Sequence, residues 1–547
     1  METPPQTEPK PNDEAQGAPE MGVPWRGLLG RMLSDRGLTK KAYLNALAAS
    51  LDYAARLATG FVINPILVGG LGDFLYGAWQ ILGRMMGYIS AAGGRPTQAL
   101  KWTIAHAQAS TDYEEKRRNV GSALSIWALF APALAVIGGV LVWITPFWLK
   151  APVELSRSVR FAAAVLVANL IVTNLVNIPE MTLRGENLGY KRMGMSTLLV
   201  VVGGGFTALA MVLDTGIVGA AVSTLAATIL SGAFYLQVTR IQVPWFGAMM
   251  PSFPEVRRFL RLSSWFLLWR FVLQLMTASD VLVLGRLVSV EFVTTYTLTK
   301  YIPETLVSMV AIVVGGIAPG LGGILGSGKL RRAARVRSEI ALVTWLVATA
   351  VGATALLWNR SFVGLWVGPD YYAGRLPTVL IMVMVVQFVL IRIDANIIDL
   401  TLNLRSKVLI GAVSALASLV AAGILVGYLE LGIVGLCLGF IVGRSILTLG
   451  YPWIIGRRLG VSLLSQFRSA LRPAFATVLL FAPVAWLGDS WTARTWPALV
   501  SFVGATAVLA GAGAFYAGLT ASQRTAIALR FRAVTGTGTP DPDDAAA

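Results

Sequence analysis

The chain has almost none of the side chains on which metal sites and much acid–base catalysis depend. Its 547 residues include one cysteine, Cys437, and one histidine, His106. A single cysteine excludes a disulfide framework and a thiolate metal site. A single histidine leaves histidine catalysis and histidine metal ligation without a partner residue. We therefore expect neither a metal nor another cofactor.

Charged residues are also scarce, at 13% of the chain, whereas soluble domains carry about 25%. Hydrophobic residues make up 55% and the mean hydropathy is +0.67, which indicates a polytopic membrane protein. Apolar runs of about 20 residues cross about 30 Å of hydrocarbon, and fourteen such runs occur here. Backbone polar groups in lipid must be satisfied within the segment, so we predict an all-α fold. The predicted helices begin near residues 45, 72, 120, 161, 195, 216, 262, 292, 340, 376, 408, 432, 473 and 497.

Acidic residues are outnumbered by basic ones, 28 to 45, which gives a net charge of +17. If the N-terminus is inside, the inside segments hold 32 lysines and arginines and the outside loops hold 6. Positive loops stay cytoplasmic, so this count predicts that both termini are cytoplasmic. Basic loops that face anionic lipid account for most of the charge without nucleic acid.

The two ends of the chain lack long apolar runs. The first 22 residues are rich in Pro, Glu and Gln and lack the basic start and apolar run of a signal peptide. We expect residues 1–40 to be a cytoplasmic tail, in which the stretch from Trp25 to Arg36 is either an interfacial helix or a plain linker. Residues 534–547 are expected to be a second disordered cytoplasmic tail.

Three short segments recur at offsets of 216 to 219 residues. NIPEMTL at Asn177–Leu183 corresponds to NIIDLTL at Asn396–Leu402, with acids at Glu180 and Asp399. GIVG at 216–219 recurs at 432–435, and LGDFLYGAW at 71–79 aligns with VSVEFVTTY at 288–296. This pattern predicts two six-helix bundles as a parallel repeat around a central cleft, plus two extra helices. We expect the N-lobe at residues 41–240, the C-lobe at 241–458 and the two extra helices at 459–533.

One motif suggests nucleotide binding and is a decoy. Gly323–Lys329 reads GILGSGK, but Leu330 stands where a P-loop needs Ser or Thr to hold magnesium. The segment also joins two predicted membrane helices, whereas a P-loop follows a buried strand. Without an ATPase, transport must draw on an ion gradient, the membrane potential or the substrate gradient.

Charges inside the predicted helices carry most of the chemical information. Each costs about 2.5 to 3.5 kcal/mol at the bilayer centre and therefore faces a cavity or a partner. Several of these charges share a helix face with another charge or with a glutamine, which predicts a wet central cleft. The residues that share a face are Asp52 with Arg56, Gln80 with Arg84, Arg270 with Gln274 and Asp280, and Lys300 with Glu304, and Arg392 is a further charge inside a predicted helix.

Two interpretations of these charges remain open. In the structural one, Asp52 with Arg56 and Lys300 with Glu304 are ion pairs that hold helices together. In the functional one, Arg84 and Arg270 have no acid one turn away on their own helix, and an unpaired guanidinium suits phosphate. We predict that Arg84 and Arg270 bind a pyrophosphate, and the weaker candidates are Lys300, Arg56, Arg392, Gln80 and Gln274. For ion coupling, Asp280 is the first choice, with Asp52 and Glu304 in reserve.

The segments LGDFLYGAW at 71–79 and DVLVLGR at 280–286 with the following VSVEFVTTY resemble the half-motifs of Wzx-type polysaccharide flippases. These belong to the multidrug/oligosaccharidyl-lipid/polysaccharide (MOP) exporter superfamily, and the resemblance runs from about Tyr43 to Arg458. It implies a V-shaped, fourteen-helix protein of the bacterial inner membrane that moves an undecaprenyl-pyrophosphate-linked oligosaccharide outward. It also implies that Asp280 is the family's seventh-helix acid. Membrane lipids and polysaccharide polymerase machinery are the other expected partners. The chain departs from the family after the second helix, where Ser90 begins SAAGGRPTQALKW.

Two alternatives compete with this function. An ion-coupled drug exporter of the same superfamily would line its cleft with acids and aromatic residues to bind organic cations. A membrane enzyme would need catalytic carboxylates in a large outer loop, whereas the predicted outer loops are all shorter than about 20 residues. We therefore expect a transporter and no enzyme.

Overall fold

The computed structural model describes residues 38–525 apart from 92, 94–95, 108–109, 193, 327, 401–403 and 489. The predicted tail before residue 38, its interfacial helix and the tail at 534–547 lie outside the described residues. So does part of the GILGSGK run, although α9 ends at Gly326 and α10 begins at Leu330. That run therefore joins two long helices, as expected.

The described part of the chain is helical and contains no strand, which confirms the all-α prediction. Among the described residues, twelve helices are long and apolar enough to cross a membrane. Following the predicted division, we call the first six helices the N-lobe: α2 (Leu38–Ala91), α3 (Pro96–His106), α4 (Tyr113–Trp148), α5 (Val153–Gly185), α6 (Met195–Val212) and α7 (Gly216–Gln242). We call the next six the C-lobe: α8 (Phe253–Leu287), α9 (Val290–Gly326), α10 (Leu330–Trp366), α11 (Arg375–Leu400), α12 (Leu404–Gly427) and α13 (Gly432–Leu459). Helices α14 (Leu463–Leu487) and α15 (Trp496–Gly518) follow, and two short 3₁₀ helices are η1 (Gly189–Arg192) and η2 (Pro369–Tyr371).

Helix α2 is two helices that meet at Gly72. This residue has φ 68° and ψ 177°, a conformation that is essentially restricted to glycine. The chain therefore turns back at the point where the second apolar run was predicted to begin. With α2 counted twice, and the short α3 left out, the described residues form fourteen long helices.

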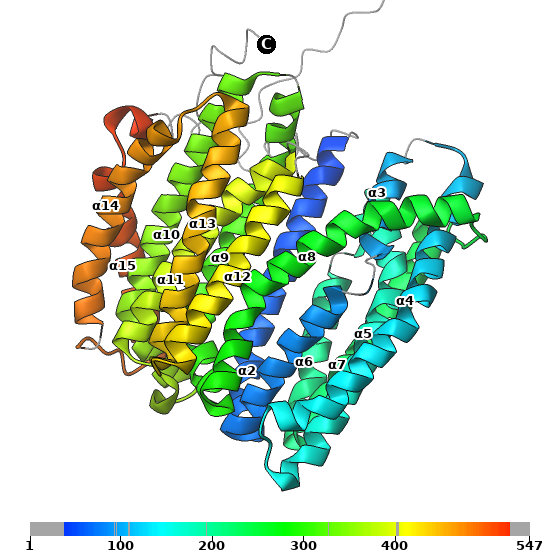
Figure 1. Cartoon of the computed structure of the whole chain (residues 1–547), viewed down its shortest axis with the longest axis horizontal. Helices are drawn as coiled ribbons and strands as arrows, with labels where there is room; N and C mark the ends of the chain where they lie inside the picture. Colours follow the sequence, from blue (N-terminus) through cyan, green and yellow to red (C-terminus); the bar gives the residue numbers. More distant parts are fainter. Residues whose placement is uncertain are drawn as a thin grey trace, which may run out of the picture.

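The helices run between two faces of the molecule (Figure 1). We call them the α3 face, which carries the start of α2, helix α3 and the end of α15, and the Gly72 face, which carries the α2 turn and η2. The sequence predicts that the α3 face is cytoplasmic. Helix α8 runs obliquely across the molecule (Figure 1) and contacts α3 and α4 of the N-lobe as well as α12 and α13 of the C-lobe.

The repeated GIVG segments start α7 and α13 with the same backbone geometry. Asp214 and Gly216 have φ values of 52° and 59°, and Glu430 and Gly432 have φ values of 54° and 51°. Two residues with positive φ separated by one residue form an unusual turn, and it occurs at equivalent places before the last helix of each lobe. This shared geometry supports the parallel repeat.

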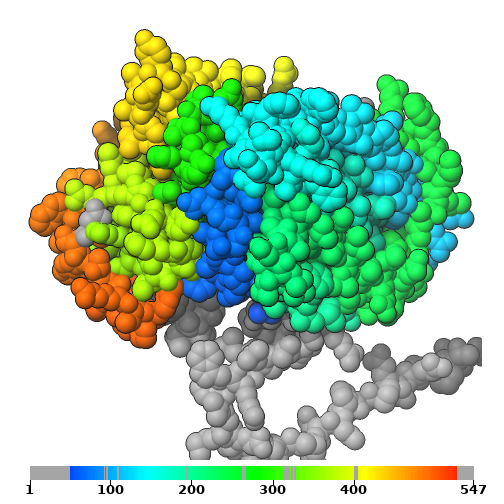
Figure 2. All heavy atoms as spheres, turned by 90° about the horizontal axis from the view of Figure 1, so that it is seen from below, coloured from blue at the N-terminus to red at the C-terminus, as the bar shows by residue number. Residues whose placement is uncertain are grey.

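The two lobes meet at the Gly72 face through specific contacts. The Tyr371 hydroxyl donates to Asp73 Oδ1 at 2.6 Å, and Thr294 Oγ1 donates to the Asp73 carbonyl at 2.7 Å. Trp366 donates from Nε1 to the Phe61 carbonyl at 2.7 Å, and the two rings stack with centroids 5.9 Å apart. Figure 2, which views this face, shows α2 packed between the helices of both lobes.

Candidate functional site

A group of basic side chains lies in the C-lobe near the α3 face. We call Arg270 of α8, Arg392 and Asp399 of α11, and Lys407 of α12 the basic cluster. Lys407 Nζ lies 2.6 Å from Asp399 Oδ1 and 3.7 Å from the centroid of the Trp269 ring. The Lys407 side chain is only 1% exposed. The charge of Arg392 interacts with those of Asp399 and Arg270, so the basic cluster holds three cations and one acid.

Arg270 and Arg392 differ from Lys407 because they have no partner of their own. Both are partly exposed. Neither makes a hydrogen bond or an ion pair with any residue that the structure describes. Each guanidinium has five N–H donors, and here those donors remain available to a ligand. The basic cluster is therefore suited to bind an anion.

A second set of charges lies deeper between the lobes. We call Arg84 of α2 and Asp280, Lys300 and Glu304 of α8 and α9 the core network. Asp280 is 2% exposed, and its Oδ2 accepts from Lys300 Nζ at 2.5 Å and from the Tyr296 hydroxyl at 2.7 Å. Glu304 Oε1 lies 3.8 Å from Arg84 and 3.9 Å from Lys300. Two cations and two acids make this network neutral.

Next to the core network, α2 of the N-lobe and α8 of the C-lobe approach each other closely at Gly87 and Gln274. Gln274 Nε2 donates to the Arg84 carbonyl at 3.4 Å. A Cβ on Gly87 would lie 2.1 Å from the same nitrogen, so a glycine permits this close approach of α2 and α8. The predicted stripe of Arg270, Gln274 and Asp280 on α8 thus runs from the basic cluster to the core network.

Asp52 and Arg56 are placed elsewhere in the N-lobe. Asp52 is buried and accepts hydrogen bonds from Ser196 Oγ at 2.6 Å and Thr197 Oγ1 at 3.3 Å, at the start of α6. Arg56 is exposed. Gln80 hydrogen-bonds with the Tyr76 hydroxyl. No described interaction connects these three predicted residues to either charged group.

The sequence analysis did not single out Arg444 of α13. This side chain is 5% exposed and lies between the rings of Phe388 and Phe440, at 5.0 and 5.1 Å from their centroids. It donates to the backbone carbonyls of Met276 and Met384, so it joins α8, α11 and α13. The available signal was a single arginine inside an otherwise apolar run. Lys407 was missed for another reason, because it precedes the apolar run predicted to begin near residue 408 and so belongs to a predicted loop.

The described residues contain no group of three or more His, Cys, Asp or Glu side chains that could hold a metal ion. The core network is a set of ion pairs, and the basic cluster combines one ion pair with two arginines that have no ion-pair partner among the described residues. None of their residues is arranged as a nucleophile with an adjacent general base.

Comparison with known proteins gives matches of two kinds. The model of a family described as polysaccharide biosynthesis protein matches residues 124–319. No curated protein matches the chain by sequence. Among solved structures, the lipid II flippase MurJ in an inward closed conformation has a TM-score of 0.65 at 12% identity, over 85% of this chain and 98% of MurJ.

Two structures of a multidrug resistance MATE family transporter of the MOP superfamily are also similar. The inward-facing one has a TM-score of 0.59 at 16% identity, over 75% of this chain and 98% of the other. The outward-facing one has a TM-score of 0.54 at 16% identity, over 77% of this chain and 96% of the other. The chain therefore has the fold of the MOP superfamily, and the resemblance to that superfamily predicted from its sequence is confirmed.

Proposed function

We propose that this protein is a flippase that moves a polyprenyl-pyrophosphate-linked oligosaccharide from the cytoplasmic to the outer leaflet by alternating access. In this proposal the membrane is the bacterial inner membrane, the α3 face and both termini are cytoplasmic, and polysaccharide polymerase machinery takes up the product. The observation that carries the proposal is the basic cluster, in which Arg270 and Arg392 lie near each other without an acid of their own.

Two neighbouring guanidinium groups repel each other unless an anion lies between them. A pyrophosphate supplies several oxygen acceptors and at least two negative charges, and arginine binds such groups bidentately. The position of the cluster near the α3 face suits the first contact with a substrate in the cytoplasmic leaflet. Arg84 and Lys300 lie deeper and already have acidic partners, so they are the next contacts along the path. Arg56 and Gln80 lie outside this path.

An inside-negative potential favours the outward movement of an anion by about 2.3 kcal/mol per charge per 100 mV. A doubly charged headgroup therefore gains about twice that energy at 100 mV, which is a sufficient driving force without ATP. Glu304 is the most accessible acid of the core network, with 45% of its side chain exposed. Coupling to an ion through Asp280, Glu304 or Asp52 is an additional part of the proposal.

The second candidate function is an exporter of organic cations, and the similarity to multidrug resistance MATE transporters favours it. The exposed carboxylate of Glu304 would be its recognition group. The excess of positive charge in the basic cluster opposes it, because an organic cation would have to approach Arg270 and Arg392.

A transport assay on purified protein in liposomes distinguishes the two functions. The test variant is Arg270→Gln combined with Arg392→Gln. The matched control is Arg286→Gln, an exposed arginine on the same helix at the Gly72 face. We expect the double variant to slow flipping of a fluorescent polyprenyl-pyrophosphate-linked sugar at least tenfold, and the control to stay within twofold of the parent. Faster transport of an organic cation than of this lipid by the parent protein would instead support the drug exporter.

A further inference from the structure

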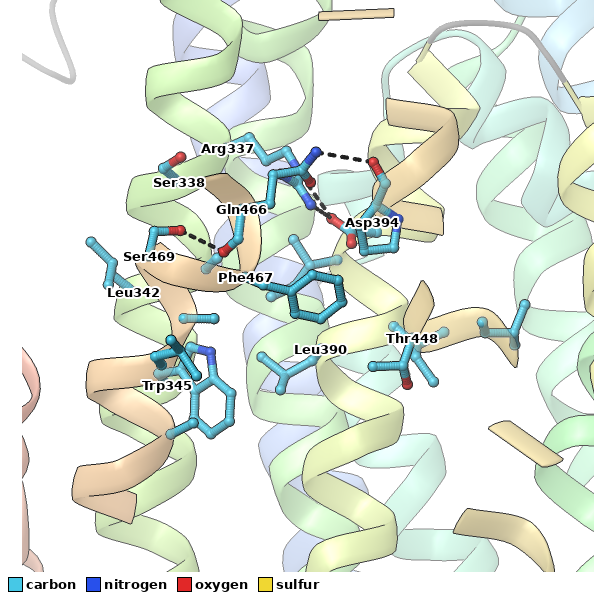
Figure 3. Close-up of a pocket in the computed structure, with 18 of the residues that line it drawn as sticks. Arg337, Ser338, Leu342, Trp345, Leu390, Asp394, Thr448, Gln466, Phe467 and Ser469 are labelled. Carbon is cyan, nitrogen blue, oxygen red and sulfur yellow. Dashed lines mark hydrogen bonds and ion pairs between the residues drawn. The ribbon is translucent and has the colours of Figure 1, made fainter. Parts of the chain in front are cut away.

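A pocket of about 320 Å³ lies between three helices of the C-lobe and α14, and none of its lining residues belongs to the basic cluster or the core network. It is formed by α10, α11, α13 and α14 at their α3-face ends (Figure 3). Its volume is at the low end of the range for small-molecule sites, about 300–1,000 Å³. The cavity is therefore too small for another helix and has room for part of one lipid chain.

The lining of this pocket changes from polar to apolar along its length. Figure 3 shows Arg337, Asp394 and Gln466 at one end and Trp345 and Leu390 at the other. Arg337 and Trp345 are eight residues apart on α10, which corresponds to about 12 Å along the helix. Arg337 is the closer of the two to the start of α10 at the α3 face. The polar end therefore lies toward the membrane surface and the apolar end toward the hydrocarbon.

The polar end keeps one acceptor without a donor. Arg337 is satisfied, because it pairs with Asp394 at 2.8 Å. Gln466 uses its Nε2 to donate to the carbonyls of Pro452 and Val461, which fixes the orientation of the amide. Its Oε1 is buried and accepts no hydrogen bond from any residue that the structure describes. A headgroup that carries a hydroxyl would supply the missing donor.

The helix ends around this pocket are strongly basic. Residues 431–488, which include α13 and α14, contain five arginines and no acidic residue. Arg331 of α10, Arg457 and Arg458 of α13, and Arg468 of α14 are exposed at the same ends. Basic pockets between membrane helices attract the headgroups of anionic lipids.

We propose that this pocket binds an anionic phospholipid of the bilayer, with one acyl chain between α10, α11, α13 and α14 and the headgroup against the basic helix ends. Such a lipid joins α14 to the C-lobe, because Gln466, Phe467 and Ala470 of α14 form one wall. This site does not depend on the transported substrate.

The test uses the full chain in detergent and measures lipid retention by native mass spectrometry, together with the shift in Tm on adding lipid. The probes are phosphatidylglycerol and phosphatidylcholine. We expect phosphatidylglycerol to bind at least tenfold more tightly and to raise the Tm more. Arg331→Gln with Arg468→Gln should remove that preference. The matched control is Arg240→Gln with Arg257→Gln, which removes two exposed arginines near the α3 face, one on α7 and one on α8. This control should keep the preference for phosphatidylglycerol.

A second variant fills the pocket with larger side chains. Ala341→Leu with Ala470→Leu should abolish retention of phosphatidylglycerol, whereas Ala505→Leu on the exposed surface of α15 should not. Equal affinity of the parent protein for the two phospholipids would overturn the proposal. An equal loss of the preference for phosphatidylglycerol in both double arginine variants would overturn it as well. Displacement of phosphatidylglycerol by an equimolar polyprenyl pyrophosphate would assign the pocket to the transported lipid instead.

Discussion

The Asp280 carboxylate receives two hydrogen bonds inside the C-lobe, from Lys300 and Tyr296, and a third from the Val281 amide at 2.9 Å. These three donors fix the position of the carboxylate between α8 and α9. Its role in ion coupling stays a prediction, and its structural role follows directly from these contacts. Glu304 belongs to the same network but is 45% exposed and lies at longer distances from its partners.

At the residue scale we predict that Asp280→Ala lowers the free energy of unfolding by about 3–5 kcal/mol, because the buried Lys300 ammonium loses its close partner and keeps only the 3.9 Å contact with the exposed Glu304. The double variant Asp280→Asn with Lys300→Met should recover much of that loss. Glu304→Gln is the control and should cost less than about 1 kcal/mol, since its ion pairs are exposed. Thermal unfolding in detergent measures all three, and equal Tm values for Asp280→Ala and Glu304→Gln would contradict the account.

At the element scale, most helices could be predicted because each transmembrane run is bounded by polar or glycine-containing segments. The repeated GIVG segments begin α7 and α13, and the motif at 71–79 marks the turn at Gly72. Side-chain partners were harder to predict. Asp52 and Arg56 have ideal spacing for an ion pair, yet the hydroxyls of Ser196 and Thr197 on α6 are bonded to Asp52 instead. Sequence spacing shows which residues share a helix face but not which neighbouring helix covers it.

The same limit of sequence spacing explains which charged residues of the candidate site were predicted correctly and which were not. Arg270 was selected because its own helix offers no acid one turn away, and the structure describes no acidic partner for it from other helices. Arg84 was selected by the same argument, but Glu304 on α9 lies 3.8 Å away. Arg444 was missed because its aromatic and carbonyl partners come from α8, α11 and its own helix.

We predict that Gly72→Ala destabilises the protein by about 1–3 kcal/mol, because alanine is strained at φ 68° and ψ 177°. Space is not the cause, since a Cβ there would meet nothing within 4 Å. Gly83→Ala is the matched control, because Gly83 is helical and equally uncrowded, so alanine should be neutral or stabilising there. Thermal unfolding of the two variants checks this. A lower Tm for Gly83→Ala than for Gly72→Ala would contradict the glycine-specific turn.

At the scale of the whole molecule, the lobes are joined at the Gly72 face by the hydrogen bonds that Tyr371 and Thr294 donate to Asp73. Burial and the hydrogen bond to Asp73 raise the pKa of Tyr371 to about 12. The Tyr371 hydroxyl is therefore a neutral donor at physiological pH. In the alternating access that we propose, this contact must break before the Gly72 face opens.

We therefore predict that Tyr371→Phe favours the state open at the Gly72 face. Losing one hydrogen bond of about 1 kcal/mol shifts the population roughly fivefold. The reporter is a cysteine in place of Val290, which is 3% exposed in the contact between the lobes, in a background that carries Cys437→Ser. Its labelling rate by a membrane-impermeant maleimide should rise several-fold in Tyr371→Phe. Arg286→Gln is the control, and unchanged labelling in Tyr371→Phe would show that this bond does not hold the lobes together.

The central claim is that the basic cluster selects a pyrophosphate-linked lipid. The most direct measurement compares the flipping rates of two fluorescent lipids with the same polyprenyl chain and the same sugar, one with a pyrophosphate linkage and one with a neutral linkage, in liposomes that contain the protein. The account predicts that the pyrophosphate-linked lipid is flipped at least tenfold faster, and that Arg270→Gln with Arg392→Gln removes this difference while Arg286→Gln preserves it. Equal rates for the two lipids, or a difference that persists in the double variant, would contradict it.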